Sequence, residues 1–513
     1  MQLSKTNISH IPRKEGLVVP DRKLFDLPEK VLQFGTGVLL RGLPDYFIDK
    51  ANRNGLFNGR FVVVKSTSNG GTDAFDRQDA LYTLCVRGIE NGQKQEEFII
   101  NSAISRVLSA TKEWDAILAC AHSAEMEVII SNTTEVGIVL VNEKISQGIP
   151  ESFPGKLLSF LWERFNAFNG SEESGMVIIP TELIPGNGDQ LKNIVLQLAE
   201  LNRLPFPFTT WLKHSNHFCN SLVDRIVPGR LPANELYEME KLLGYSDELM
   251  IMAESFRLWA IESGHPKVTE ILSFAAADKG VVIAPDIEKF RELKLRLLNG
   301  THTLSCGLAW LAGFSTVKDA MNDEEVGSFI SNLCQQEIAE AISDDSISHS
   351  EARDFATKVL DRFRNPFLDH QWLSIAVQYT SKMRMRVVPI LLRHYNKKEN
   401  VPSHIALGFA AYLLFMKSSQ NNKLEYKGFA NNTTYLIQDD EAGFIADKWH
   451  DNDIERVVDT VLSDSSFWGT DLFVLNGFAQ AIKSNLRSLL KNGVVPTIKR
   501  VITNKPVDEF YTT

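Results

Sequence analysis

Three features that would assign the protein to a specialised class are scarce in its sequence. The 513 residues contain only five cysteines, widely spaced and without a C-x-x-C pair, which excludes a disulfide framework or a zinc ribbon as the basis of the fold. The longest apolar run, residues 405–416, is shorter than the roughly 20 residues that span a bilayer, so we expect a buried helix there. The N-terminus lacks the apolar segment of a secretory signal, and a cytoplasmic location is therefore expected.

A surplus of positive charge is lacking as well. The 54 Lys and Arg residues face 64 Asp and Glu residues, which gives a formal net charge of -10. That sign disfavours binding to nucleic acid through the net field, and neither a nucleic-acid nor a membrane partner is expected. With 44% apolar and 23% charged residues, the composition is typical of a folded globular chain of roughly two to four domains. The sequence does not indicate an oligomeric state.

The N-terminal half contains short apolar runs that alternate with helical stretches. The runs at 31–34, 61–64, 127–130 and 176–179 have the length and the β-branched content of buried strands. Alternation of this kind predicts a parallel sheet covered by helices. From about residue 205 the pattern turns helical, for example over 234–243, 247–262 and 286–298, while 396–403 and 418–428 have the composition of surface loops. The expected fold is an α/β N-terminal domain followed by a mostly α-helical C-terminal domain.

A glycine turn follows the first apolar run. Gly35 and Gly37 stand between that run and a helix start, as in a dinucleotide-binding turn, where glycines let the backbone approach a pyrophosphate and the helix N-terminus offers free N–H groups. Leu40 replaces the third glycine of that fingerprint. The second run continues into Lys65, which could tolerate a 2'-phosphate, rather than into the usual acidic residue. The choice between NAD and NADP therefore stays open, and a purely structural glycine turn is the alternative.

A second polar constellation lies near residue 300. Lys294, Asn299 and His302 have a K-x4-N-x2-H spacing at the end of one helical run and the start of the next. A lysine with a lowered pKa can exchange a proton with a hydroxyl, an asparagine can donate to a developing alkoxide, and a histidine can orient the substrate. The structural alternative is a solvated lysine, an asparagine cap before Gly300 and a satisfied core histidine. Spacing alone leaves both interpretations open.

These residues lie within longer stretches that resemble the long-chain, metal-independent mannitol dehydrogenase family of polyol and sugar-acid dehydrogenases. The stretches follow the family order over most of the chain and are RQDALYTL (77–84), PTELIPGNGDQL (180–191), NSLVDRIVP (220–228), KLRLLNGTH (294–302) and RFRNP (362–366). Similarity to the sugar-acid branch of that family is carried by QFGTGVLLRG (33–42), SNTTEVGI (131–138), AMNDEEV (320–326) and RFRNPFLDHQWLSIA (362–376).

The resemblance implies a Rossmann-type domain with a parallel-rich sheet over residues 20–284 and a mostly helical substrate-binding and catalytic domain over 285–513. It implies NAD as the cofactor and no metal. The cofactor-binding positions that it suggests are Phe34, Gly35, Gly37, Leu39, Arg41, Asn132, Thr134 and Glu135.

The resemblance also assigns catalytic roles. Lys294 would be the general acid/base, and Asn299 with Asn187 would hydrogen-bond the alkoxide-like oxygen. His302 and Asp224 would shape the surroundings of the substrate and the lysine. For Asp224, a buried ion pair with the adjacent Arg225 is an equal alternative.

A sugar-acid substrate requires cationic donors for its carboxylate. Lys382, Arg384 and Arg386 supply three basic residues in one stretch. Because guanidinium grips carboxylate bidentately, we hypothesise that Lys382 and either Arg384 or Arg386 hold the substrate carboxylate. A solvated basic helix face is the alternative, since residues at i, i+2 and i+4 cannot all point one way on a helix.

The resemblance implies an NAD-dependent oxidoreductase that interconverts D-tagaturonate and D-altronate in hexuronate breakdown. Sister activities of the family, the reduction of fructuronate or the oxidation of mannitol, would differ only in pocket residues. A non-catalytic dinucleotide-binding or sensor protein is an alternative of another class, suggested by the missing third glycine and the missing acidic residue. Retention of the whole K-x4-N-x2-H set argues against it.

Overall fold

The computed structural model describes residues 1–66, 71–133 and 137–503. The chain forms two compact units. The first comprises Met1–Gly88 and Lys94–Glu288, and the second comprises Ile89–Gln93 and the chain from Lys289 onward.

The centre of the first unit is a six-stranded sheet with the order β6-β3-β2-β7-β8-β9. All neighbouring strands of this sheet run parallel. The strands are β2 (Glu29–Phe34), β3 (Arg60–Lys65), β6 (Ile104–Ser109), β7 (Val128–Ser131), β8 (Val177–Pro180) and β9 (His217–Phe218). The four predicted runs coincide with β2, β3, β7 and β8. Since β3 and β7 flank β2 on opposite sides, the strand order reverses between β2 and β7, which is where ligands bind in open α/β sheets.

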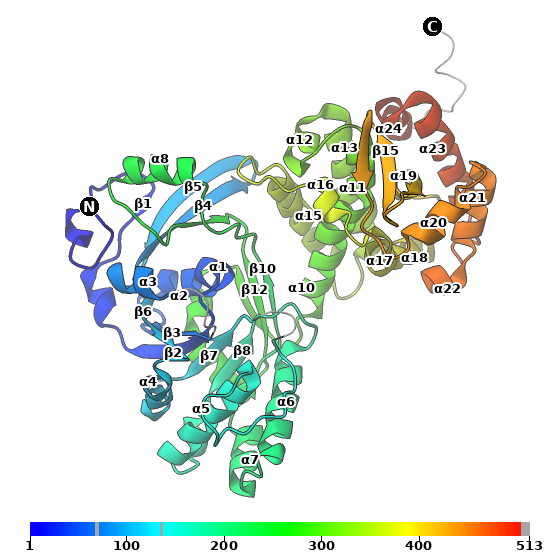
Figure 1. Ribbon diagram of the computed structural model, residues 1–513. Helices are drawn as coiled ribbons and strands as arrows, with labels where there is room; N and C mark the ends of the chain where they lie inside the picture. The colour runs from blue at the N-terminus through cyan, green and yellow to red at the C-terminus, as the bar shows by residue number, and fades with distance from the viewer. Residues whose placement is uncertain (67–70, 134–136, 504–513) are drawn as a thin grey trace. The chain divides into compact units, whose positions relative to one another are not determined.

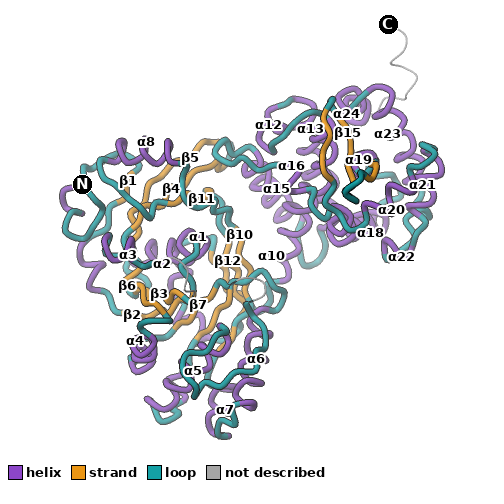
Figure 2. The backbone as a smooth tube through the Cα atoms, viewed as in Figure 1, coloured by secondary structure: helices purple, strands orange, loops and turns teal. Residues whose placement is uncertain are grey.

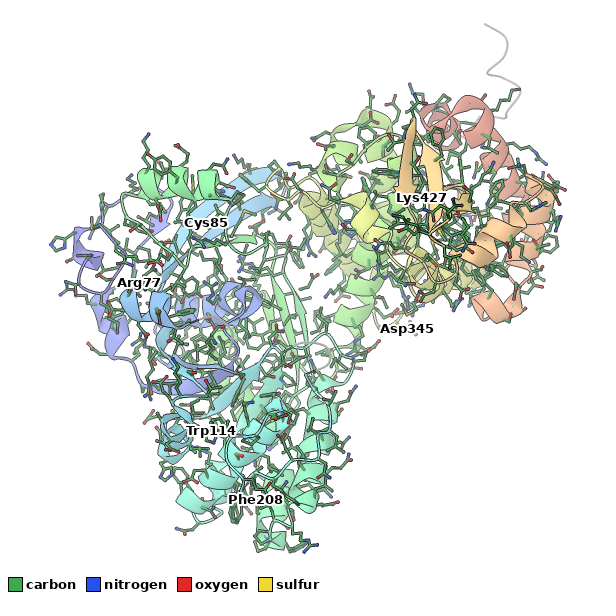
Figure 3. All side chains as sticks on the ribbon, in the orientation of Figure 1. Arg77, Cys85, Trp114, Phe208, Asp345 and Lys427 are labelled. Carbon is green, nitrogen blue, oxygen red and sulfur yellow. The ribbon has the colours of Figure 1, made fainter. Side chains whose placement is uncertain are left out.

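Successive residues of these strands face two different cores. Val63 and Ile130 belong to one core, together with Phe47 of helix α2 (Pro44–Arg53). Their neighbours Val62 and Ile129 belong to the other core, which helices α5 (Phe153–Ala167) and α6 (Asn187–Leu201) cover, as Figure 1 shows. Trp114 and Phe208, labelled in Figure 3, complete this second core. A sheet buried on both faces explains why the strands have continuous apolar runs rather than alternating ones.

Short helices fill the remainder of the first unit. The other α-helices are α1 (Val38–Gly42), α3 (Asp73–Arg77), α4 (Trp114–Ala119), α7 (Phe206–His214), α8 (Ala233–Leu243) and α9 (Pro266–Ile271). The 3-10 helices are η1 (Ile8–His10), η2 (Arg22–Asp26), η3 (Cys120–His122), η4 (Glu172–Ser174) and η5 (Ser273–Ala277).

Two smaller sheets also belong to the first unit. One has the order β1-β5-β4-β11 and the other the order β10-β12-β13. The strands are β1 (Leu17–Val18), β4 (Tyr82–Glu90), β5 (Gln93–Asn101), β10 (Ser221–Asp224), β11 (Ile251–Glu254), β12 (Leu258–Glu262) and β13 (Val281–Ala284).

The prediction of a helix over 247–262 is wrong, because β11 and β12 lie there. Both strands are short and largely buried, and a short apolar run does not distinguish a buried strand from a buried helix. Pairing with distant strands decides the conformation, since Ile251 lies opposite Leu84 of β4 and Trp259 lies opposite Val281 of β13.

The second unit is mainly helical, as the purple segments from α10 onward in Figure 2 show. Its α-helices are α10 (Glu288–Leu293), α11 (Thr301–Leu311), α12 (Val317–Asn322), α13 (Glu324–Asn332), α14 (Ala339–Ile342), α15 (His349–Phe363), α16 (Trp372–Ile375), α17 (Tyr379–Lys382), α18 (Val388–Lys397), α19 (Ser403–Phe415), α20 (Ala442–Lys448), α21 (Ile454–Leu462), α22 (Ser465–Trp468), α23 (Phe478–Asn492) and α24 (Val494–Thr503). Helix α19 is buried along almost its whole length, as its apolar sequence predicts. The predicted fold class is confirmed.

Segment 418–428 is not a loop, contrary to the prediction. It contributes β14 (Ser418–Gln420) and the start of β15 (Tyr426–Ala430), which form an antiparallel sheet with β16 (Thr433–Leu436). Tyr435 lies opposite Gly428, where a Cβ atom would lie 2.3 Å from the tyrosine ring, and its own ring packs 4.7 Å from that of Phe415. The sheet thus depends on a glycine that lies at the end of the predicted loop.

Three helical stretches of the second unit have π geometry. They are η6 (Lys294–Gly300), η7 (Leu333–Ile338) and η8 (Met383–Val387). The helix break expected near Asn299 does not exist, because α10, η6 and α11 follow one another without interruption. Gly300 is a packing position instead of a helix end, since a Cβ there would lie 3.0 Å from Ile390 of α18.

Candidate active site

The glycine turn continues β2 and β3 beyond the edge of the sheet. The N–H of Gly35 donates to the carbonyl of Val64, and the N–H of Asn132 donates to the carbonyl of Phe34. Gly35 has a φ of 130°, and a Cβ atom there would lie 2.9 Å from Leu40 and 3.2 Å from the carbonyl oxygen of Asn132. Only glycine fits this position without strain. At the exposed Gly37, by contrast, nothing lies within 4 Å of an added Cβ, so the backbone is open to a ligand.

The helix after the turn is shorter than the fingerprint predicts. Helix α1 ends at Gly42, and Leu43 leaves helical geometry with φ -134° and ψ -76° before α2 begins at Pro44. The cause is local, because a proline ring disfavours the α conformation of the residue before it. Phe34 is fully buried and packs on Phe153, with 5.1 Å between the ring centroids.

Arg41 has structural partners inside the first unit. Its guanidinium donates to the carbonyl of Leu249 at 2.7 Å and lies over the ring of Tyr82 at 5.3 Å. The side chain is 8% exposed, and burial lowers its pKa. Leu39 packs against the core on the α2 side of the sheet. The cofactor-binding roles of both residues stay predictions.

The candidate cofactor residues after β7 are only partly visible. Asn132 is described, and its amide donates to the carbonyl and to the hydroxyl of Thr181 at 3.1 and 3.0 Å. Thr134 and Glu135 lie outside the described residues. At the end of β3, the buried Lys65 is followed by Ser66, whose hydroxyl is buried and makes no hydrogen bond within the described residues.

Asn187 is held by the backbone at the start of α6. Its amide nitrogen lies 3.0 Å from each of the carbonyls of Pro180, Glu182 and Ser221, and its amide oxygen accepts the N–H of Ser221 at 2.9 Å. The residue is fully buried. Both amide hydrogens are therefore engaged, and its predicted donation to a substrate oxygen would require one of these bonds to be exchanged.

Asp224 ends β10 and is 6% exposed. The neighbouring Arg225 donates to the carbonyls of Glu254 and Gly42 at 2.9 and 2.6 Å, and its guanidinium lies 4.5 Å from the ring centroid of Tyr46. These contacts of the Arg225 guanidinium are with two backbone carbonyls and an aromatic ring. The predicted role of Asp224 stays a prediction.

The π-helical segment η6 gives Lys294 and Asn299 a common face. Residues five apart lie about 140° apart around an α-helix, whereas i→i+5 is the hydrogen-bonding period of a π-helix. Both side chains are half-buried, and the carbonyl of Asn299 accepts a hydrogen bond from the hydroxyl of Thr303 at 2.7 Å. The K-x4-N spacing therefore brings the two side chains close together only in a π-helix, and the sequence does not predict that geometry.

Arg296 connects η6 to η8. Its guanidinium donates to the carboxylate of Glu292 at 3.1 and 3.2 Å and to the carbonyls of Met385 and Arg386 at 2.6 and 3.2 Å. The segment that carries Lys294 is thereby fastened to the segment that carries two of the three basic candidates.

His302 lies in an aromatic cage one turn beyond Asn299. Its ring stacks on Phe363 with 4.0 Å between centroids, and it meets His370 and Trp372 edge-on at 5.0 and 6.1 Å. It is 6% exposed, and its Nε2 atom makes no hydrogen bond within the described residues. Burial, followed by the charges of His370 and Arg362, holds its pKa well below the usual value, so the ring is neutral at pH 7.

The three basic candidates separate into two groups. Arg384 pairs with Glu441 at 3.4 Å and lies 5.1 Å from the ring centroid of Phe467. Lys382 and Arg386 act on His302 instead, because both lower its pKa. Arg386 also donates to the hydroxyl of Thr303 at 3.3 Å, and burial lowers the pKa of both Lys382 and Arg386.

Two further basic residues of this cluster are not among the predicted site residues. Arg362 and His370 both lower the pKa of His302, and burial, followed by the charges of Arg362 and Lys382, lowers the pKa of His370 itself. Arg362 stands in the stretch RFRNP, which served only as a mark of resemblance. His370 lies in the longer stretch 362–376, which likewise marks the resemblance without a role for the histidine, and its proximity to His302 arises from the packing of α11 against α16.

Other chemistries find no support in the described residues. No group of three His, Cys, Asp or Glu side chains is arranged to hold a metal ion there. Cys306, one turn beyond His302, is buried, and burial raises its pKa to about 12, which disfavours a thiolate nucleophile. Within the part of the chain that the structure describes, no helix is long and apolar enough to cross a membrane.

A parallel sheet with a glycine turn beside the point where its strand order reverses is the architecture of Rossmann-type dinucleotide-binding domains. Residues 29–271 match the mannitol dehydrogenase Rossmann domain, and residues 286–490 match the mannitol dehydrogenase C-terminal domain. The chain belongs to the mannitol dehydrogenase family. The predicted family and the predicted dehydrogenase class are thereby confirmed.

Relatives of known name match nearly the whole chain. The sequence is 38% identical to the altronate oxidoreductase of Bacillus subtilis over 450 residues, which cover 87% of this chain and 89% of that protein. It is 35% identical to the altronate oxidoreductase of Halalkalibacterium halodurans over 490 residues, or 94% of each chain.

Solved structures of two polyol dehydrogenases have the same fold. Mannitol 2-dehydrogenase of Pseudomonas fluorescens, in a ternary complex with NAD and D-mannitol, has 23% identity and a TM-score of 0.66 over 99% of this chain and 100% of that chain. D-Sorbitol dehydrogenase in substrate-free form has 20% identity and a TM-score of 0.73 over 97% of this chain and 100% of that chain.

Proposed function

We propose that the protein is an NAD-dependent oxidoreductase that interconverts D-tagaturonate and D-altronate. The observation that carries this proposal is the match to proteins named altronate oxidoreductase over 87% to 94% of the chain. A cationic cluster in the second unit supports it independently, because an aldonate differs from a neutral polyol by its carboxylate.

The first unit suits the dinucleotide. Gly35 brings the turn against Asn132, and the exposed Gly37 leaves open backbone beside the reversal point of the sheet. The buried hydroxyl of Ser66 makes no hydrogen bond within the described residues and lies at the end of β3, where a ribose lies in folds of this type. When bound, NAD would supply or accept the hydride. We assign residues 20–284 to cofactor binding and 285–513 to substrate binding and catalysis.

Lys294 is the general acid/base of the proposed reaction. It gives a proton to the keto oxygen in reduction and takes a proton from the hydroxyl in oxidation. Asn299, on the same face of η6, donates a hydrogen bond to that oxygen while charge develops on it. The ring of His302 is neutral, and its Nε2 atom, which has no hydrogen-bond partner among the described residues, would contact a substrate hydroxyl. Asn187 and Asp224 remain candidates for the same tasks from the first unit.

Lys382 and Arg386 hold the substrate carboxylate in this proposal. Both are half-buried and belong to the cluster around His302, whereas Arg384 already has an acidic partner in Glu441. Gathering cations in a half-buried place costs stability unless an anion joins them, which a carboxylate would do. Lys382 and Arg386 would therefore bind an aldonate, which carries a carboxylate, in preference to a neutral polyol.

Location and partners complete the proposal. All five cysteines are free and buried, as is usual in a reducing compartment, and we propose that the protein works in the cytoplasm. Its partner is the small sugar acid.

The test is absorbance-monitored oxidation of NADH, with NADPH in parallel, against D-tagaturonate, D-fructuronate and D-fructose at matched concentrations. We expect fast turnover only for D-tagaturonate with NADH. Preference for D-fructuronate or D-fructose would contradict the substrate assignment and favour a sister activity of the family. Binding of NADH without turnover on any substrate would favour a non-catalytic dinucleotide-binding protein.

The same assay tests the role of Lys294. Removal of a general acid/base lowers turnover by roughly 100-fold or more, so Lys294→Ala should lose at least that much kcat while NADH binding is kept. Lys289→Ala is the matched control, because Lys289 lies five residues earlier and pairs with Glu351 at 2.7 Å. An active Lys294 variant, or equal losses in both, would refute the assignment.

A further inference from the structure

The buried carboxylate of Glu182 contacts the segment at the end of β7, residues 131–133, which includes the candidate cofactor residue Asn132. Glu182 follows β8 and is 2% exposed. One carboxylate oxygen accepts both the N–H and the hydroxyl of Thr133, at 2.8 and 2.9 Å. The other oxygen accepts the hydroxyl of Ser131 at 3.1 Å. Three donors from one three-residue segment therefore converge on one side chain.

The residue next to Glu182 holds the same segment from the other side. The hydroxyl of Thr181 donates to the carbonyl of Ser131 at 2.7 Å, and its N–H donates to the same carbonyl at 2.8 Å. Thr181 in turn accepts from the amide of Asn132 at 3.0 Å. Each of the three residues 131–133 is thus hydrogen-bonded to residue 181 or 182.

This segment borders the glycine turn. A Cβ at Gly35 would lie 3.2 Å from the carbonyl oxygen of Asn132, and the N–H of Asn132 donates to Phe34. Because the backbone of Asn132 contacts the turn directly, a displacement of residues 131–133 would also displace Gly35.

The topology assigns a particular half of a dinucleotide to this segment. The sheet reverses between β2 and β7, so β2, β3 and β6 form one mononucleotide half and β7, β8 and β9 the other. In a doubly wound sheet the glycine turn after the first strand serves the pyrophosphate, and the second half receives the nicotinamide side. Ser131–Thr133 end the first strand of the second half.

We propose that Glu182 is a positioning residue that fixes residues 131–133 for the nicotinamide half of the dinucleotide. This inference rests on the proposed NAD-dependent function. A carboxylate suits the task because hydrogen bonds to an ionised acceptor are about twice as strong as neutral ones, and because one oxygen serves two donors of the same residue. Loss of Glu182 leaves the N–H of Thr133 without its acceptor, and the segment relaxes.

The experiment compares two ligands that share the adenosine half. Titrations of NADH and of ADP-ribose give separate dissociation constants for wild type, Glu182→Gln and Glu182→Met. For Glu182→Met we expect the constant of NADH to rise by about 10-fold or more and that of ADP-ribose by less than about 2-fold. Glu182→Gln keeps an acceptor for Thr133 and should lie between wild type and Glu182→Met.

Asp49 provides a matched control. It is 1% exposed in the same unit, and one of its oxygens accepts both the N–H and the hydroxyl of Ser102, at 2.8 and 2.9 Å. It lies on α2, outside the candidate cofactor residues. Asp49→Asn should lower the melting temperature and leave the ratio of the two dissociation constants unchanged.

The outcomes are separable. Wild type that binds neither ligand contradicts the proposed cofactor, independently of Glu182. Wild type that binds both, with equal changes for the two ligands or no change in the Glu182 variants, overturns the role of Glu182. If Glu182→Met does not fold, Thr133→Val and Ser131→Ala remove the hydroxyl donors singly, and the selective loss of NADH binding must appear in at least one of them.

Discussion

At the scale of single residues, the three basic side chains of 382–386 differ in what already neutralises them. Arg384 has Glu441 and the ring of Phe467, whereas Lys382 and Arg386 belong to the cluster of basic residues around His302. Lys382 donates to the carbonyl of Ile375 at 2.8 Å, and the charge of Asp439 offsets only part of the lowering of its pKa. We therefore expect Arg386→Met and Lys382→Met to raise KM for D-altronate by about 10- to 100-fold, as loss of a charge-assisted hydrogen bond does. Steady-state kinetics at saturating NAD measures this change.

Arg384→Met is the control for that measurement. Its exposed ion pair contributes about 0–1 kcal/mol, so KM for D-altronate should change by less than about 3-fold. A neutral alditol of the same configuration adds a second check, because its KM should hardly respond to any of the three variants. A large effect of Arg384→Met, together with an unaffected Arg386→Met, would exchange their roles.

At the scale of elements, the sequence predicts the sheet that would hold the cofactor better than it predicts the rest. The runs that became β2, β3, β7 and β8 are short, β-branched and followed by turns, so local signals suffice. The pattern over β11 and β12 wrongly predicts a helix, because the conformation of these strands depends on partners that are distant in the sequence. Gly428 in β15 was likewise part of a predicted surface loop, and its pairing with Tyr435 is a contact that the local sequence does not indicate.

The candidate site shows the same limit. Lys294, Asn299 and His302 are found from spacing and resemblance, but a spacing of five residues favours no common face on an α-helix. The π geometry of η6 brings the two residues closer to a common face, and the segment packs against η8 and α15, which are distant in the sequence. His370 reaches His302 only through tertiary packing.

Arg296 makes the pairing of η6 and η8 testable. The substitution Arg296→Lys keeps the positive charge. A lysine side chain cannot, however, reach the carboxylate of Glu292 and the carbonyls of Met385 and Arg386 at the same time. We expect a loss of about 1–3 kcal/mol in the free energy of unfolding, because buried acceptors lose their donor. KM for D-altronate should rise as well, since η8 carries Arg386. Denaturant unfolding and steady-state kinetics measure the two effects.

Arg393 offers the matched control for that variant. It pairs with the same Glu292 at 2.8 Å, but its side chain is 35% exposed and it lies on α18. Arg393→Lys should cost no more than about 1 kcal/mol and leave KM unchanged. If both lysine variants behave alike, Arg296 does not couple the two segments.

At the scale of the whole molecule, buried ionisable groups respond to acid in opposite directions, and Asp45 and His302, with strong shifts of opposite sign, lie in different units. In the first unit, burial raises the pKa of Asp45 and Asp247. In the second unit, burial and neighbouring cations lower the pKa of His302 and His370. Below pH 6.5 these two histidines bind protons in the unfolded chain but remain neutral in the folded one. The second unit therefore loses stability as the pH falls. Folded Asp45 holds a proton that the unfolded chain releases, so acid favours the first unit at that position.

We therefore expect the second unit to unfold at a lower temperature relative to the first when the pH falls from 7.5 to 5. His302 alone would contribute a loss of at most about 2 kcal/mol at pH 5, because its unfolded pKa lies about 1.5 units above that pH. Calorimetry at both pH values measures the separation, and hydrogen exchange assigns each transition to a unit. His302→Asn should reduce the separation, whereas His450→Gln, which alters a side chain that is 84% exposed, should leave it unchanged. Equal shifts of both transitions with pH, or an unchanged separation in His302→Asn, would contradict the opposing responses of the two units.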